Sequence, residues 1–247
     1  MSKNIKRLSF FAAKIESSNI YYFGILFLIC LFVLGLTFYC INLHLTGFNF
    51  LVSQGMEKHT ASFLAHLLQV LIYNTVLISC TASGMKIFGI SLSEIGWKKP
   101  DNFKKIILSV AIMTIYIFAW GIFLSLYKTG TFHYYIVTLN KNWADLGNPS
   151  VYIFLFTAVF NAPIEEVFYR GFLQTAIEKK LGAKYAIFFT SIIYALSHMR
   201  VSKNLTQKFI SGLILGSLKN WGTTLWNPIA GHLTKNIIAS WFSIRYF

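Results

Sequence analysis

Long apolar runs with few charges alternate with short polar stretches along the first half of the chain. The first run lasts from Ile20 to about Leu43, the second from about Ala61 to Ile87, and the third covers about Ile106–Leu126. Each is longer than the roughly 17 residues that an α-helix needs to cross the hydrocarbon core of a bilayer. The runs are near-continuous rather than alternating at every second residue, which favours helices over strands. The pattern therefore predicts three transmembrane helices.

The polar stretches between these runs predict loops. We expect a polar loop over Thr46–His59 and a loop with a surface segment over Phe88–Lys105. The second loop is rich in lysine, which is typical of the cytoplasmic side and places it on the same side as the basic N-terminus. The stretch Tyr127–Pro149 is aromatic and sparsely charged, which is typical of the outer interface of a membrane.

The second half of the chain has shorter and more interrupted apolar segments. Ser150 is a candidate N-cap for a helix that continues past Gly171 to about Lys180, and Pro163 within it is able to cause a kink. The apolar segments that follow are Tyr185–His198, Phe209–Leu218 and Thr223–Phe242. We therefore predict an all-α fold, a polytopic transmembrane helix bundle with about seven membrane segments.

Composition supports a multi-pass protein of the cell membrane, because 55% of the residues are hydrophobic and only 12% are charged. A soluble domain carries about a quarter charged residues. The net charge of +14 fits a basic cytoplasmic face on anionic lipid, so we expect the bilayer and no nucleic acid as a partner. Cys30, Cys40 and Cys80 lie in or beside apolar spans without a CxxC pair, which indicates neither a disulfide framework nor a zinc–cysteine site.

Candidate chemistry centres on Glu165 and Glu166, two of only eight acidic residues, which directly follow a strongly apolar run. Ionised carboxylates are costly there unless a partner or a function retains them. Adjacent residues on a helix project about 100° apart, so we expect the two side chains to face different ways. Glu166 and Arg170 are i, i+4 neighbours and can pair, which leaves Glu165 freer to accept a proton from water. The alternative is a structural ion pair at a helix end.

Three further polar residues lie in apolar segments of the second half. His198 closes one such segment, with Tyr194 four residues earlier on the same helical face. His232 and Asn236 also share a helical face, where they can position a carbonyl and stabilise a developing oxyanion. The alternative for each is a structural role, such as hydrogen bonds between helices.

Two other patterns concern metal binding and helix packing. Two histidines and a glutamate match the ligand count of a catalytic zinc site, but no HExxH helix is present, so the sequence neither requires nor rules out zinc. Gly212 and Gly216 form a small-xxx-small pattern that lets helices approach closely.

These motifs, taken together, resemble the CPBP family, the CAAX proteases and bacteriocin-processing intramembrane proteases that are also called Abi proteins. The family's EExxxR motif matches Glu165–Arg170, and its HxxxN motif matches His232–Asn236. Its FxxxH motif matches Tyr194–His198, with tyrosine in place of phenylalanine. The resemblance covers roughly residues 150–242.

The resemblance implies hydrolysis of a peptide bond within the membrane. Glu165 would activate a water with help from His198, and Glu166 and Arg170 would orient that site. His232 and Asn236 would bind the scissile carbonyl or its oxyanion. The resemblance leaves open whether the protease is of the glutamate type or depends on a metal.

The chain then divides into a basic cytoplasmic arm at residues 1–19, N-terminal transmembrane helices and loops at 20–149, and a CPBP-like catalytic helical core at 150–247. The expected partner is a peptide or membrane-protein substrate, and the expected role is bacteriocin self-immunity or peptide processing. A bacteriocin or its membrane receptor is then a further partner. The alternatives are a non-catalytic immunity protein that occupies the bacteriocin's receptor, and a transporter, against which the lack of a visible internal repeat argues.

Overall fold

The structure is a computed structural model that describes residues 17–129, 159–199 and 205–243. The described residues form helices and contain no strand, which confirms the predicted all-α fold. The first half supplies three long helices, α2 (Ser17–Ser53), α3 (Lys58–Phe88) and α4 (Phe103–Thr129). The predicted arm at 1–19 and the predicted outer loop at 127–149 fall mostly outside the described residues.

The predicted loop at Thr46–His59 is wrong in its first half, because α2 continues to Ser53. Residues 47–52 are mostly apolar and contain no proline, and a Cβ on Gly47 would lie 3.7 Å from Ala65 Cβ of α3. Packing against α3 thus extends the helix beyond the point at which weak local propensity suggested a stop. The turn itself occupies residues 54–57, where Gly55 adopts a left-handed φ of 85°.

The second half begins with an irregular helix. Residues 159–166 are helical and lead into a π-helical segment, η2 (Val167–Leu173), and then into α7 (Gln174–Leu181). The Gln174 N–H donates to the Tyr169 carbonyl, five residues back, which is the signature of a π-helix. The irregularity that we expected at Pro163 therefore occurs after the two glutamates. The expected start at Ser150 lies outside the described residues.

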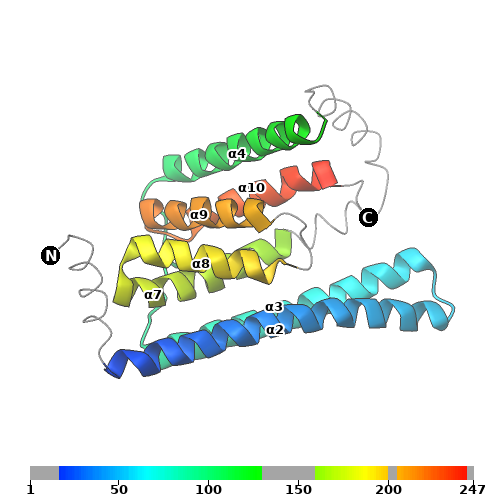
Figure 1. Cartoon of the computed structure of the whole chain (residues 1–247), viewed down its shortest axis with the longest axis horizontal. Helices are drawn as coiled ribbons and strands as arrows, with labels where there is room; N and C mark the ends of the chain where they lie inside the picture. Colours follow the sequence, from blue (N-terminus) through cyan, green and yellow to red (C-terminus); the bar gives the residue numbers. More distant parts are fainter. Residues whose placement is uncertain (1–16, 130–158, 200–204, 244–247) are drawn as a thin grey trace.

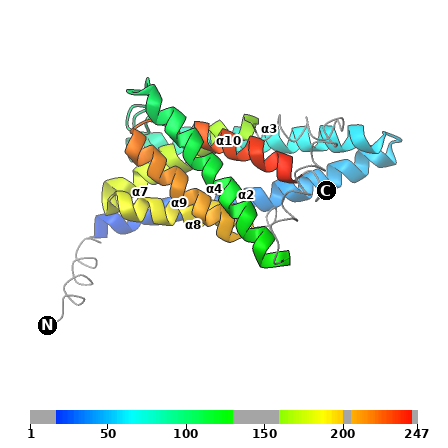
Figure 2. The ribbon, with the colours of Figure 1, turned by 90° about the horizontal axis from the view of Figure 1, so that it is seen from above.

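Three shorter helices complete the bundle. They are α8 (Ala183–Ser197), α9 (Leu205–Gly222) and α10 (Trp226–Ser243). Figure 1 shows the helices stacked in layers: α4 lies on α9 and α10, these lie on α7 and α8, and the hairpin of α2 and α3 forms the far layer. Seen from above, the α2–α3 hairpin extends beyond the rest of the bundle (Figure 2).

Small residues allow the layers of the second half to approach closely. A Cβ on Gly212 would lie 2.9 Å from Ser191 Cβ of α8, and one on Gly216 would lie 3.0 Å from Gln174 Oε1. These distances confirm the close helix approach that the small-xxx-small pattern predicted. A glycine also allows close packing between the two halves of the chain, since Gly84 of α3 packs directly against the Phe172 ring of η2.

Three helices in the described part of the chain are long and apolar enough to cross a membrane. They cover Asn19–Ser53, Thr60–Phe88 and Phe103–Tyr127. Large apolar side chains on them face outward; Phe32 is 57% exposed and Ile115 is 68% exposed. Such a surface suits lipid rather than water, so the protein is a membrane protein. Among the remaining helices, α8 has 15 residues and α9 and α10 have 18 each, close to the lower limit for a span.

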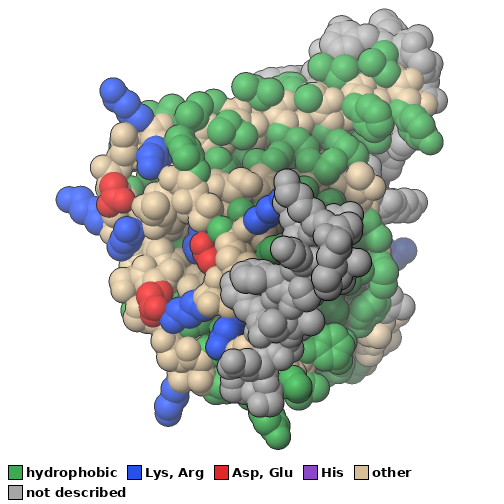
Figure 3. Space-filling model, turned by 60° about the vertical axis from the view of Figure 1, so that its left-hand side comes forward, with side chains coloured by type: hydrophobic (Ala, Val, Ile, Leu, Met, Phe, Trp, Pro, Cys, Tyr) green, Lys and Arg blue, Asp and Glu red, His purple; other side chains and the backbone are tan. Residues whose placement is uncertain are grey.

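In the view of Figure 3, charged side chains gather toward one end of the molecule, beside large apolar areas. This end includes the α3–α4 connection, which an ion pair ties to α7 through Lys179 Nζ and Glu94 Oε1 at 2.8 Å. The Lys179 ammonium, with hydrogen bonds from Ser91, lowers the pKa of the Glu94 carboxyl to about 2. Glu94 therefore stays ionised near physiological pH and pairs with Lys179.

Candidate active site

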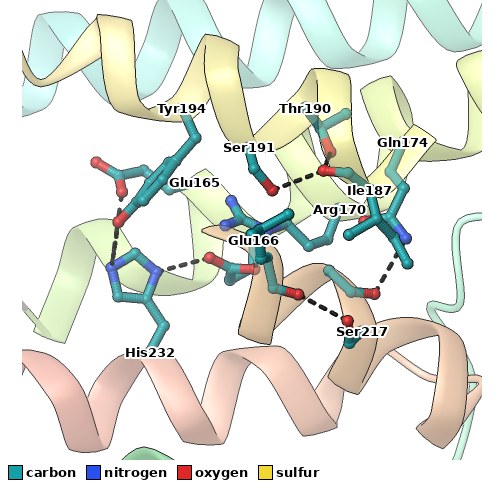
Figure 4. A network of polar contacts seen from close by, with 12 residues as sticks. Glu165, Glu166, Arg170, Gln174, Ile187, Thr190, Ser191, Tyr194, Ser217 and His232 are labelled. Atoms are coloured by element: carbon teal, nitrogen blue, oxygen red, sulfur yellow. Dashed lines mark hydrogen bonds and ion pairs between the residues drawn. The ribbon is translucent and has the colours of Figure 1, made fainter. Parts of the chain in front are cut away.

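The predicted site residues come from three segments of the second half, and Figure 4 shows four of them, Glu165, Glu166, Arg170 and His232. Glu165 and Glu166 end the helical stretch 159–166, and Arg170 lies in the π-helical segment that follows. His232 projects from α10 toward both glutamates. The start of the helical stretch 159–166 is held to α3 by a hydrogen bond of 2.7 Å from Asn74 Nδ2 to Asn161 Oδ1.

Glu166 is fully buried and has two partners. Its Oε2 lies 3.3 Å from Arg170 Nε, which confirms the i, i+4 pair expected from the sequence. Its Oε1 accepts a hydrogen bond of 2.7 Å from His232 Nδ1. The Arg170 guanidinium is also fully buried and lies over the Tyr194 ring, with Cζ 4.4 Å from the centroid. The two carboxylate oxygens of Glu166 thus contact Arg170 and His232 and hold both side chains in place.

Glu165 is the freer carboxylate. Its Oε2 lies 3.8 Å from His232 Nε2, beyond hydrogen-bond distance. Its side chain is 9% exposed, whereas that of Glu166 is 0% exposed. The two glutamates therefore flank the same imidazole at its two nitrogens, although we expected them to face different ways.

His198 joins this cluster indirectly. It caps the C-terminal end of α8, and its Nδ1 lies 2.8 Å from the Tyr194 carbonyl oxygen. Its ring packs on the Tyr194 ring at a centroid distance of 4.5 Å, as the i, i+4 spacing predicted. Because a carbonyl only accepts, Nδ1 carries the proton and Nε2 is the acceptor nitrogen. Asn236 is half-buried, one turn beyond His232 on α10.

The sequence analysis missed Lys235, which is only 4% exposed. Its Nζ donates a hydrogen bond of 2.7 Å to the Tyr194 hydroxyl, which in turn lies 3.4 Å from His232 Nε2. The sequence pattern that indicates a role for Lys235 is a lysine within an otherwise apolar helix, since ionisable groups at membrane depth are rare unless they are functional. Tyr194, expected only to pack on His198, also links the lysine to His232.

Metal binding finds no support in the described part of the chain, where no three His, Cys, Asp or Glu side chains are grouped as a metal ion would require. The cations that interact with the carboxylates in the described part of the chain are side chains of this protein, Arg170, Lys208 and Lys235.

The motifs and this geometry define a class, that of helical membrane proteins with a buried glutamate–histidine site. Residues 147–238 match the family described as "Type II CAAX prenyl endopeptidase Rce1-like". The matched segment contains all the predicted site residues, so it confirms the resemblance to the CAAX-protease family. No curated protein and no solved structure matches the chain.

Proposed function

We propose that the protein is an intramembrane endopeptidase that hydrolyses a peptide bond with a water activated by Glu165. The observation that carries the proposal is that the two glutamates differ in their contacts. Glu166 forms an ion pair with Arg170 and a hydrogen bond with His232, whereas Glu165 lies beside His232 Nε2 without a hydrogen bond to it. A carboxylate held next to, but not within, a fixed network is suited to act as a base.

In this mechanism Glu165 accepts a proton from water while the water oxygen attacks the carbonyl carbon of the scissile bond. Nε2 of His198, an acceptor nitrogen fixed by the Tyr194 carbonyl, helps to orient that water. The Asn236 amide donates to the oxyanion of the tetrahedral intermediate. Glu165 then returns the proton to the leaving nitrogen as the C–N bond breaks.

The contacts of His232 support a role different from the one implied by the resemblance. Both of its nitrogens face carboxylates, at 2.7 Å from Glu166 and 3.8 Å from Glu165. We therefore propose that His232 holds Glu166 in place through Nδ1 and lies beside Glu165, and that Asn236 supplies the main hydrogen bond to the oxyanion.

We further propose that residues 150–247 form the catalytic core and that the substrate is a peptide or a membrane protein. The proposed biological role, bacteriocin self-immunity or peptide processing, is supported by the resemblance to the CPBP family. A bacteriocin or its membrane receptor is then the natural partner.

Replacing Glu165 with glutamine tests both the mechanism and the role. The amide is nearly isosteric but cannot take a proton from water, so E165Q should lower the hydrolytic rate by about 10²–10⁴-fold. Cells producing E165Q should lose protection against the bacteriocin at equal membrane levels of protein. The matched control is E57Q, which removes an exposed glutamate at the α2–α3 turn and should protect like wild type.

Two other outcomes would count against parts of this proposal. Full protection by E165Q would rule out hydrolysis as the basis of immunity and favour receptor occupancy. Lack of protection by wild type and variant alike would rule out the immunity role and direct the search to processed peptides.

A further inference from the structure

A buried lysine and a buried tyrosine form a pair beside the proposed catalytic residues. The Lys235 ammonium has hydrogens to donate and no lone pair with which to accept. In the 2.7 Å contact between Lys235 Nζ and the Tyr194 oxygen, the oxygen must therefore be the acceptor. The hydrogen of the Tyr194 hydroxyl is then left to donate elsewhere.

The next atom along this chain of contacts is Nε2 of His232, 3.4 Å from the Tyr194 oxygen (Figure 4). At the opposite side of the ring, Nδ1 lies 2.7 Å from Glu166 Oε1. An ionised carboxylate only accepts, so Nδ1 carries a proton. A consistent direction follows: Lys235 donates to Tyr194, Tyr194 to His232, and His232 to Glu166.

The charges in the cluster favour a neutral imidazole in this arrangement. Three cations, Arg170, Lys208 and Lys235, already interact electrostatically with Glu165, and Glu166 is the only other carboxylate of the described cluster. A protonated His232 would add a fourth cation in surroundings where unmatched charge is costly. This balance of charges therefore supports an unprotonated Nε2.

We infer that Lys235 and Tyr194 are positioning residues that keep His232 neutral, with its proton on Nδ1 and with Nε2 accepting a hydrogen bond from the Tyr194 hydroxyl beside Glu165. The FxxxH motif has phenylalanine at the position of Tyr194 and so lacks the hydroxyl on which this pair depends. The catalytic consequence, which rests on the proposed function, is that Nε2 has no proton to donate to the Glu165 carboxylate, so Glu165 stays free to accept one from water.

The protonation of His232 can be measured directly by nitrogen NMR of purified protein labelled with ¹⁵N-histidine. Ring nitrogens with and without a proton give well-separated signals, and H232Q identifies those of His232. The variants are K235M, which removes the donor; Y194F, which removes only the hydroxyl; and K235R, which keeps a donor-only cation. The control K219M removes another buried lysine, whose Nζ contacts Thr175 Oγ1 at 3.1 Å and Glu178 Oε2 at 3.3 Å.

In wild type we expect Nδ1 to be protonated and Nε2 to be unprotonated and hydrogen-bonded. Y194F should move the Nε2 signal toward that of a free acceptor nitrogen, and K235M should produce a second form with a proton on Nε2. K235R and K219M should leave the wild-type signals unchanged. Combining Y194F with K235M should give less than the sum of the two single effects, because the lysine acts through the tyrosine.

A protonated Nε2 in wild type would overturn the inference, and so would unchanged His232 signals in both Y194F and K235M. If K235M does not accumulate, Y194F decides the question by itself, since it installs the residue of the family motif. The spectra need no substrate. A failure of this inference is therefore distinguishable from a failure of the proposed protease activity, which E165Q tests.

Discussion

Arg170 is the buried cation of the site's i, i+4 ion pair. Its side chain is 1% exposed, with Glu166 as its ion-pair partner and the Tyr194 ring on its face. A buried ion pair adds little net stability, but removal of one partner leaves the other charged and unpaired. The pair therefore makes the position of Glu166, and through it that of His232, depend on Arg170.

We accordingly expect R170M to destabilise the protein by about 3–5 kcal/mol, because it leaves the Glu166 carboxylate buried without its cation. The measurement is chemical or thermal unfolding of purified protein in detergent. The double variant E166Q/R170M should be more stable than R170M, because no uncompensated charge remains. Wild-type stability of R170M would show that the pair does not hold the site.

At the scale of elements, the site depends on how closely α8 and α9 approach η2 and α7. Gln174 Nε2, directly after η2, donates a hydrogen bond of 3.1 Å to the Gly216 carbonyl of α9. The same helix carries Gly212 against the backbone of Ser191, where a Cβ would lie 3.0 Å from Ser191 Cα. The depth and rotation of α8, and with them the position of Tyr194, are therefore set by glycines outside the catalytic motifs.

G212A should destabilise the protein by about 1–3 kcal/mol, because the added methyl group meets backbone that cannot move aside. It should also lower activity by displacing Tyr194 and His198. The matched control is G35A, since a Cβ on Gly35 meets no atom within 4 Å. There the better helix propensity of alanine should leave stability unchanged or raise it by up to about 1 kcal/mol. Equal effects of the two substitutions would contradict the close approach.

For the whole molecule, the basic residues of the described helices gather toward one end, which we propose faces the cytoplasm together with the N-terminus. This end includes the α3–α4 connection, which contacts the α9–α10 junction through a hydrogen bond of 2.9 Å from Leu225 N to the Gly96 carbonyl. The turn between α2 and α3 lies at the other end of these long helices (Figure 1). A lysine-rich end is the one that stays in the cytoplasm during insertion.

Cysteine labelling tests this orientation after replacement of Cys30, Cys40 and Cys80 by alanine. A membrane-impermeant maleimide added to intact cells should label Q54C, at the α2–α3 turn, because we expect this turn outside. It should label K99C, in the α3–α4 connection, only after lysis. Both positions are exposed, so accessibility within the fold does not distinguish them. Labelling of K99C in intact cells would reverse the proposed orientation.

The sequence by itself determined the all-α membrane fold and the Glu166–Arg170 pair, because both depend on local quantities. A long apolar run forms a helix whatever surrounds it in a bilayer, and i, i+4 neighbours meet on any helix. It also placed most helix bounds within a few residues. It failed where a contact between helices outweighed a weak local signal, as in the extension of α2 to Ser53.

Only the tertiary structure decided which side chains meet across helices. His232 contacts Glu166 from 66 residues away, and Lys235 reaches Tyr194 from 41 residues away. Such contacts depend on the relative depth and rotation of packed helices, which glycines such as Gly212 set and no local periodicity encodes. For this reason the sequence identified the carboxylates and the histidines. The position of His232 between the two glutamates, and the contact of Lys235 with Tyr194 beside it, became visible only in the fold.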